Sequence, residues 1–380
     1  MRRTWAIAAA IILLALLCRL PWALQPRTVR WDEPDFLILA RHVLRGEGYQ
    51  VFGVPELIWP PGAPAFAAIS LAVGVPIEQA LALWHAVAGA LACGLLYGLS
   101  REVTGDGRVA AIAGLLAATS PALAVRPLYW GSLTESIFLA FWLTGLWATW
   151  RLLNGERWPA GLTAGVAFAV AYLTRPEGLI WWGGFLVLGV GLAVWRRKGW
   201  RALSCYALSF LILIAPYLFY LYHHTGRLML SGKLGITIVL GMRVTELGSG
   251  LGHDYAAALD STGKEIIWLS PERFEISLWD VIRADPRGAL RRLRRNLFRA
   301  WNILPDPLLG LAVIGLIGLG LWGRPWDRRR WIREGFLFAA IAPLGIVPFF
   351  HVQPRLLVPL IPIVLIWAAR GVLHVASWAD

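Results

Sequence analysis

Residues 30–49 read RWDEPDFLILARHVLRGEGY and follow directly on an apolar run over residues 4–24. Asp32 and Glu33 stand side by side at the head of this stretch. Pro34 suits the first turn of a helix, where acidic side chains are also favoured. The pattern therefore predicts a short helix near the membrane surface, with the acidic pair at its positive end.

Two interpretations of this acidic pair remain open. Asp32 could simply cap the predicted helix, as aspartate often does. Alternatively, the helix end keeps its carboxylate ionised, and such a group at a water–lipid boundary can take a proton from a hydroxyl nucleophile. The rest of the outward-facing sequence bears on this choice.

The composition is that of a membrane protein. Of the 380 residues 58% are hydrophobic, 22 are Trp and only 16% are charged, and the mean hydropathy is +0.60. A soluble domain of this length needs a more polar surface. The apolar runs are long and do not alternate, which favours helices over a closed barrel. The predicted fold class is all-α, a polytopic helical bundle of about ten membrane helices with additional interfacial helices.

The apolar runs divide the chain into ten predicted spans. A retained first span is favoured over a cleaved secretory signal. Residues 61–76 are short for a crossing and carry Pro near both ends, so they are expected to be re-entrant or interfacial. The ten predicted spans are 4–24, 78–100, 109–125, 132–152, 159–175, 178–196, 202–222, 303–322, 334–350 and 355–373.

Basic residues in the short loops are distributed unevenly between the two sides of this topology. The loops 101–108, 151–158, 196–201 and 323–333 share a side with both termini, and this side carries 16 Lys and Arg residues against 3 in the opposite short loops. The positive-inside rule assigns the basic side to the cytoplasm. The net charge of +13 is thereby explained by the loops, and lipid phosphates are more natural partners than nucleic acid.

This topology gives a single integral membrane domain over residues 1–380 with two long outer segments, 25–77 and 223–302. The second contains ADPRGALRRLRRNLFRAWN, in which leucines share one helical face and arginines occupy the rest, as is typical of an interfacial helix. Cys18, Cys93 and Cys205 lie in or beside apolar runs, and they do not form a disulfide framework.

Charged and polar residues recur at the other outward-facing ends of the spans, where ionisable groups often mark function. Glu135 could instead be a buried partner of an arginine, Arg175 could pair with Glu177 in a structural turn, and Trp59 could anchor at the interface or stack on a sugar. His85 is expected to be a satisfied core residue. The candidates are Arg126, Tyr129 and Glu135, then Arg175 and Glu177, then Lys233, and finally Arg355.

The order of these motifs resembles the glycosyltransferase family 39 branch of the GT-C fold, which includes protein O-mannosyltransferases and aminoarabinose transferases. The similarity runs over residues 5–373 and consists of the DE pair, the stretch IWPPGAP, TES at the start of a span, the turn TRPEG and the final PRLLVPLIP. The resemblance implies a polyprenyl-phosphate-linked sugar donor, with Asp32 as catalytic base and basic residues holding the lipid phosphate. The chain lacks the soluble C-terminal domain and some spans of larger relatives, which leaves the acceptor open.

The expected function is therefore inverting transfer of a sugar to a hydroxyl of a lipid, glycan or protein, at the outer face of a bacterial inner membrane. Asp32 and Glu33 are the expected catalytic residues, and the other candidates are expected to bind substrate or lipid phosphate. The mechanism demands no cofactor or metal. The alternative is a transporter or flippase of a lipid-linked sugar. It would favour paired half-sequences with broken helices, and no such internal repeat is visible.

Overall fold

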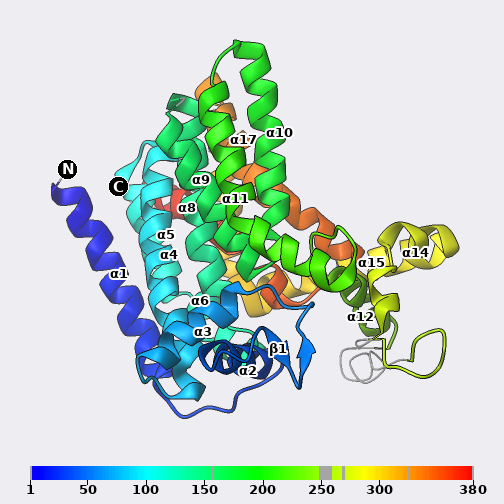
Figure 1. Cartoon of the computed structure of the whole chain (residues 1–380). Coiled ribbons are helices and arrows are strands. Elements are labelled where there is room, and N and C mark those ends of the chain that lie inside the picture. The colour runs from blue at the N-terminus through cyan, green and yellow to red at the C-terminus, as the bar shows by residue number, and fades with distance from the viewer. Residues whose placement is uncertain (1, 156, 248–258, 268–269, 324–325, 379–380) are drawn as a thin grey trace.

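The computed structural model describes residues 2–155, 157–247, 259–267, 270–323 and 326–378. These residues are almost entirely helical (Figure 1). Six helices are long and apolar enough to cross a membrane: Thr4–Ala23, Ile77–Thr104, Glu135–Gly155, Gly178–Arg196, Trp200–Thr225 and Arg328–Phe349. They contain α1 (Arg2–Ala23), η1 (Ile77–Gln79) with α4 (Ala80–Thr104), α8 (Glu135–Gly155), α10 (Gly178–Arg196), α11 (Trp200–Thr225), and α17 (Arg328–Ile341) with η5 (Ala342–Phe349).

Three further predicted spans correspond to shorter apolar helices. These are α5 (Gly107–Thr119), α9 (Trp158–Thr174) and α18 (Leu360–Ala376). Pro121 ends the predicted span 109–125 early, because a separate turn of helix, α6 (Pro121–Ala124), follows α5. The segment expected not to cross contains α3 (Gly62–Ala72), whose 11 residues are too short for a bilayer.

The prediction of one continuous span over 303–322 is wrong. The chain instead forms α15 (Pro286–Ile303), the irregular turn η4 (Leu304–Leu309) and α16 (Leu311–Trp322). The two parts of this pair are bent by 101°. Pro305 and Pro307 explain the break, since proline cannot continue the hydrogen-bond ladder of a helix.

Glycines allow the closest helix contacts in the bundle. A Cβ on Gly320 of α16 would lie 1.9 Å from the carbonyl oxygen of Trp367, and one on Gly371 of α18 would lie 2.0 Å from that of Leu316. The same holds between α9 and α11, where a Cβ on Gly161 would lie 2.1 Å from the Ala202 carbonyl oxygen. Small residues are the usual means by which membrane helices approach so closely.

Side-chain contacts confirm that the basic loops and both terminal helices share one end of the bundle. Each contact joins two of these segments, which are far apart in the sequence. They are Arg101 to Thr4, Arg151 to Glu102, Arg196 to the Leu153 carbonyl, Arg333 to the Thr104 carbonyl, and Glu334 to Arg370. The grouping of loops predicted from charge is thus correct.

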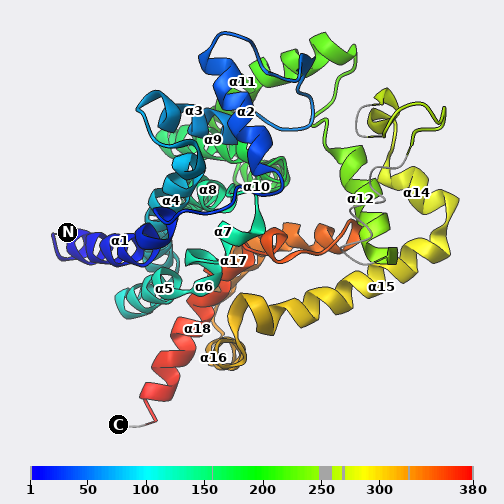
Figure 2. The same cartoon turned by 90° about the horizontal axis from the view of Figure 1, so that it is seen from below.

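The two long segments, 25–77 and 223–302, meet at the opposite end. Residues 25–77 form α2 (Glu33–Leu44), a small antiparallel pair β1 (Gln50–Val51) and β2 (Val54–Pro55), and α3. The Tyr220 hydroxyl at the end of α11 donates to the Tyr49 carbonyl at 2.8 Å. The described part of 223–302 forms α12 (Leu234–Leu247), η3 (Pro271–Phe274), α14 (Leu278–Ala284) and α15. Figure 2 shows α12, α14 and α15 extending sideways from the bundle.

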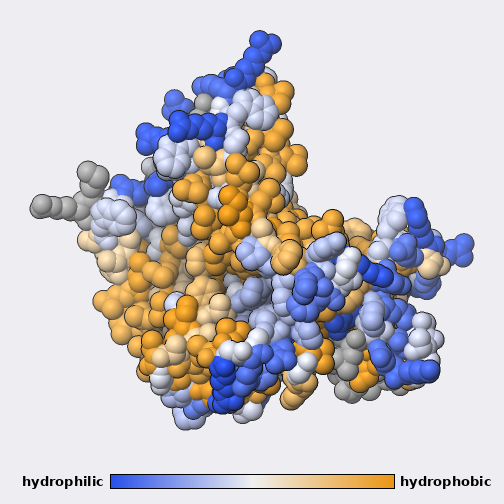
Figure 3. All heavy atoms as spheres, viewed as in Figure 1, coloured by the Kyte–Doolittle hydropathy of each residue, from blue (hydrophilic) through white to orange (hydrophobic). Residues whose placement is uncertain are grey.

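The surface agrees with a membrane setting. Figure 3 shows hydrophobic side chains over the sides of the bundle, and hydrophilic ones at both of its ends and over the projecting α14. The protein is therefore an integral membrane protein, with the acidic pair at the end opposite the basic loops.

Candidate functional site

Asp32 lies just before α2, but its side chain does not cap the helix. Its backbone is in the helical region, and its Oδ2 accepts a hydrogen bond from Nη1 of Arg355 at 2.9 Å. The two side chains are 20% and 17% exposed. The capping interpretation is therefore wrong, and the carboxylate faces a cation from the far end of the chain.

Arg355 lies in the short turn η6 (Pro354–Leu356), immediately before α18. Its Nε donates to Oε1 of Gln353 at 2.9 Å, which fixes the plane of the guanidinium. Its carbonyl oxygen accepts from Nη1 of Arg175 at 3.5 Å. The turn before the last helix thus joins the acidic pair to the turn between α9 and α10.

Arg175 is held by two carboxylates. Its guanidinium lies 3.3 Å from Glu135 at the start of α8 and 3.3 Å from Glu177 two residues on. Glu135 also accepts from the Ser132 hydroxyl at 2.9 Å. The ion-pair interpretations of Glu135 and of Arg175 with Glu177 are confirmed, and the same pairs hold Arg175 against the Arg355 carbonyl.

Lys233 adds a third cation to this group. It lies directly before α12, and its Nζ is 4.0 Å from the ring centre of Trp59. Within the described part of the chain, Lys233 forms no ion pair within 4.0 Å. The Trp59 ring is only 6% exposed, and its Nε1 donates to Asp35 at 3.1 Å. Trp59 is therefore neither an interfacial anchor nor open to a sugar; it supports the lysine.

The charges of this cluster control one another's ionisation. Burial raises the pKa of Asp32, but the charges of Arg355, Lys233 and Arg175 outweigh it and hold the pKa below its usual 3.8. Burial lowers the pKa of Lys233 to about 8, although Asp32 and Glu177 oppose this change. The cluster therefore holds an ionised carboxylate beside an amine that titrates near neutral pH.

Glu33 has a different environment from Asp32. Its side chain is completely buried, and its Oε2 accepts from Nη1 of Arg27 at 2.8 Å. Its backbone N–H donates to the Gly131 carbonyl at 3.2 Å. Glu33 thus ties the start of α2 to the turn before α8.

Arg126 and Tyr129 lie apart from the cluster. Arg126 precedes α7 (Pro127–Trp130) and pairs with Asp306 of η4 at 3.3 Å. Tyr129 is 57% exposed. No contact among the described residues joins either side chain to Asp32, Arg355 or Lys233. The structure brings together five of the predicted binding residues, namely Glu135, Arg175, Glu177, Lys233 and Arg355, but not these two.

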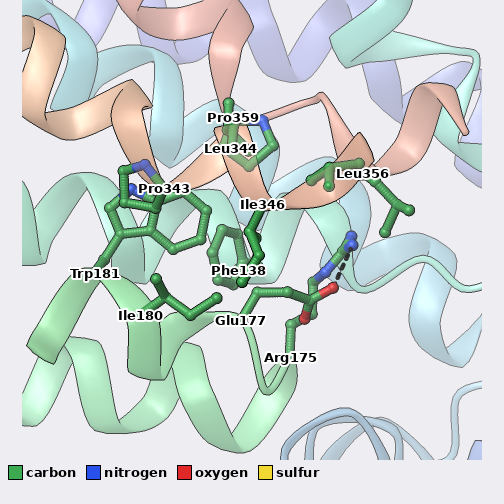
Figure 4. A pocket seen from close by; sticks show the side chains of 11 residues that line it. Phe138, Arg175, Glu177, Ile180, Trp181, Pro343, Leu344, Ile346, Leu356 and Pro359 are labelled. Carbon is green, nitrogen blue, oxygen red and sulfur yellow. Dashed lines mark hydrogen bonds and ion pairs between the residues drawn. The ribbon is translucent and has the colours of Figure 1, made fainter. Parts of the chain in front are cut away.

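An apolar pocket opens beside the cluster (Figure 4). Arg175 and Glu177 form its charged edge and point toward one another. The remaining wall comes from α8, α10, η5 and the region of η6: Phe138, Ile180, Trp181, Pro343, Leu344, Ile346, Val347, Leu356 and Pro359. The pocket thus joins an apolar wall to one charged edge.

Sequence reasoning missed several supporting residues. Arg27 lies six positions before Glu33 and Gln353 two before Arg355, so proximity in sequence was an available signal for both. The roles of Asp35 and Ser132 depend on side-chain placement and carry no such signal. Among the residues that the structure describes, no group of three or more His, Cys, Asp and Glu could hold a metal ion. His85 is a satisfied core residue as expected, bonded to Ser136 and the Ala124 carbonyl.

The helical bundle with the short helices at its end has the GT-C fold. Residues 59–220 match the family model of dolichyl-phosphate-mannose-protein mannosyltransferases. The matched range includes Glu135, Arg175 and Glu177, whereas Asp32, Lys233 and Arg355 lie outside it. No curated protein matches the sequence.

Solved structures support the same fold. ArnT from Cupriavidus metallidurans bound to undecaprenyl phosphate is 18% identical, with a TM-score of 0.56 over 99% of this chain and 61% of that one. The apo oligosaccharyltransferase from Archaeoglobus fulgidus is 16% identical, with a TM-score of 0.61 over 99% of this chain and 51% of that one. The chain therefore spans about half to three fifths of the length of these proteins.

Proposed function

We propose that this protein transfers a sugar from a polyprenyl-phosphate-linked donor to a hydroxyl acceptor with inversion, and that Asp32 is the base. The proposal is carried by one observation, the ionised Asp32 carboxylate lying 2.9 Å from Arg355 within a group of three cations. The family match and the ArnT structure with undecaprenyl phosphate support a lipid-linked donor.

In the proposed reaction the acceptor oxygen attacks the anomeric carbon while Asp32 takes the hydroxyl proton. The new carbon–oxygen bond forms as the bond from the anomeric carbon to the phosphate oxygen breaks. Polyprenyl phosphate leaves with the bonding electron pair and needs no proton. A positioned general base contributes about 10²–10⁴ to such a rate.

Arg355, Lys233 and Arg175 are the groups that would stabilise the leaving phosphate. Guanidinium groups fit phosphate oxygens in pairs, and positioned cations act strongly where water is excluded. Without donor, Arg355 holds Asp32. A donor phosphate would compete for Arg355, and the pKa of Asp32 would then rise because Arg355 is the first of the cations that lower it. Donor binding would thereby make Asp32 a stronger base.

The apolar pocket beside Arg175 supports this placement of the donor. Its aromatic and aliphatic wall would face the lipid chain, with the phosphate at the Arg175 edge. Glu135 and Glu177 would orient Arg175, and Glu33 would position Asp32 through the backbone. Arg126 and Tyr129 would contact lipid or acceptor outside this core.

We place the site at the outer face of a bacterial inner membrane, because the opposite end of the bundle carries the basic loops. In this arrangement residues 1–380 act as one membrane domain, with 25–77 and 223–302 on the outer side. The transporter alternative is not favoured, since the family model and the solved structures above are of transferases.

The deciding experiment uses purified protein in detergent with a polyprenyl-phosphate sugar and a panel of hydroxyl acceptors. The transferase proposal expects acceptor-dependent release of free polyprenyl phosphate, which Asp32→Asn slows about 10²–10⁴-fold. A well-folded protein that releases none with any acceptor, but moves the lipid-linked sugar between leaflets of a vesicle, would establish the transporter instead. Mass spectrometry of lipid-linked sugars that accumulate without the protein would identify the donor.

A further inference from the structure

The helix α15 presents three distinct faces. One faces the protein, where Nδ2 of the buried Asn296 donates to the carbonyls of Pro348 and Phe350 at 2.9 and 3.1 Å. These bonds fix the rotation of the helix about its axis. At its start, Asp285 accepts from the Gly288 N–H at 2.8 Å and caps it.

The second face is an apolar stripe that nothing in the described structure covers. Leu290, Leu297 and Trp301 are spaced seven and four residues apart, so they share one side of a helix with 3.6 residues per turn. They are 67%, 53% and 69% exposed. Exposed apolar side chains in a row mark a contact with lipid or another apolar surface.

The third face is a basic stripe beside the apolar one. Arg287, Arg291 and Arg295 follow at four-residue spacing and are all exposed. Within the described residues their side chains make no hydrogen bond or ion pair. Three adjacent cations without internal partners form a surface that attracts anionic groups.

The orientation of α15 places these two stripes at a lipid boundary. The helix meets α16 at a bend of 101°, and α16 packs along α18 through Gly320 and Gly371, so α15 runs across the direction of these bundle helices. The junction is at the start of α16, whereas the basic loop 323–333 follows its other end. Figure 2 shows α15 reaching sideways from the bundle rather than over it.

We propose that α15 is an interfacial helix that binds the headgroups of anionic phospholipids through Arg287, Arg291 and Arg295, with Leu290, Leu297 and Trp301 in the acyl region. Helices with this division of faces lie in the interface and gain affinity from both apolar burial and anionic lipid. This surface is separate from the Asp32 cluster, and the proposal stands independently of the transferase function.

The test is photo-crosslinking from p-benzoylphenylalanine in place of Leu297, with the protein in nanodiscs of equimolar phosphatidylglycerol and phosphatidylcholine. We expect lipid adducts on residues 286–303, with phosphatidylglycerol several-fold in excess. The triple variant Arg287→Gln, Arg291→Gln, Arg295→Gln should equalise the two lipids, and added salt should weaken the preference. The matched control Arg328→Gln, Arg329→Gln, which removes exposed arginines from a basic loop, should leave it unchanged.

Thermal unfolding in detergent verifies that each variant is folded, which is expected because the three arginines have no partners among the described residues. The proposal is overturned by equal yields of the two lipids in the unaltered helix, by a preference that survives in the triple variant, or by adducts to protein alone in place of lipid.

Discussion

Nη1 of Arg355 lies 2.9 Å from Oδ2 of Asp32, although 323 positions separate the two residues in the chain. The contact joins the first outer segment to the turn before the last helix. It also sets the ionisation of Asp32, since Arg355 is first among the charges that lower its pKa. The proposed base and the proposed phosphate site thus share one guanidinium, and several expectations depend on it.

Asp32→Asn should reduce sugar transfer about 10²–10⁴-fold, because the amide cannot accept the acceptor's proton. The substitution nearly preserves size and releases Arg355 from its carboxylate partner, so donor binding should not weaken. Product formation under single turnover measures the effect. Glu47→Gln is the matched control, a half-exposed carboxylate in the same outer segment. Full activity of the Asp32 variant would refute its role as base.

Arg355→Ala should move the acidic limb of the pH–rate profile to higher pH. Burial raises the pKa of Asp32, and removing Arg355 takes away the first of the charges that oppose it. The base is active when ionised, so activity would then be lost at a higher pH as acid is added. In Arg355→Lys the acidic limb should lie between those of the unaltered protein and Arg355→Ala. Lysine keeps the positive charge but cannot form the paired hydrogen bonds of a guanidinium. Identical acid limbs in all three proteins would contradict the coupling.

Affinity for polyprenyl phosphate should fall as the pH rises through about 8, the pKa to which burial lowers Lys233. Below that pH the amine is protonated and attracts the phosphate; above it the charge is lost. An ordinary lysine would keep its charge to about 10.4. Isothermal titration between pH 6.5 and 9.5 measures this, and Lys233→Arg should flatten the curve. An unaltered slope in that variant would assign the pH dependence to another group.

Arg27→Gln should destabilise the fold by about 3–5 kcal/mol, because it leaves the completely buried Glu33 without its cation. The double variant Arg27→Met, Glu33→Leu should recover much of that loss, since an apolar pair needs no charge compensation. Denaturation midpoints in detergent measure both. Were the double variant no more stable than the single one, the pair would have a role beyond charge compensation.

Gly131→Ala should impair transfer by disturbing the start of α2. Gly131 has φ +85°, and a Cβ there would lie 2.2 Å from Cδ1 of Trp31, the residue before Asp32. Its carbonyl also accepts the Glu33 N–H. Gly46→Ala is the matched control, because Gly46 has φ +72° with nothing within 4 Å. Both variants cost about 1–2 kcal/mol of backbone strain. A larger loss of activity in Gly131→Ala would therefore come from the displacement of Trp31 and Asp32 and not from strain alone. Equal losses would remove that explanation.

Some of the architecture could be predicted because its cause is local. Long apolar runs predicted the six long helices, and the distribution of Arg and Lys predicted which loops share an end. Alternating Leu and Arg at helical spacing predicted α15. The break between α15 and α16 was missed, because Pro305 and Pro307 were included at the edge of an otherwise apolar run.

The candidate site could be predicted only in part. The grouping of Asp32, Arg175, Lys233 and Arg355 at one end of the bundle followed from the order of spans. The burial of Trp59 under Lys233, and the separation of Arg126 from the cluster, did not. Both depend on how the outer segments fold over the helix ends, which the alternation of spans does not determine.

The sequence by itself determined that the chain enters a membrane, where most of its helices begin and end, and that an acidic pair lies outside the first of them, because hydrophobicity and charge act over neighbouring residues. Only the tertiary structure decided that Asp32 meets Arg355 while Glu33 meets Arg27. Two adjacent carboxylates are chemically similar in sequence. They acquire different environments only when helices packed through Gly161, Gly320 and Gly371 bring distant cations to one and bury the other.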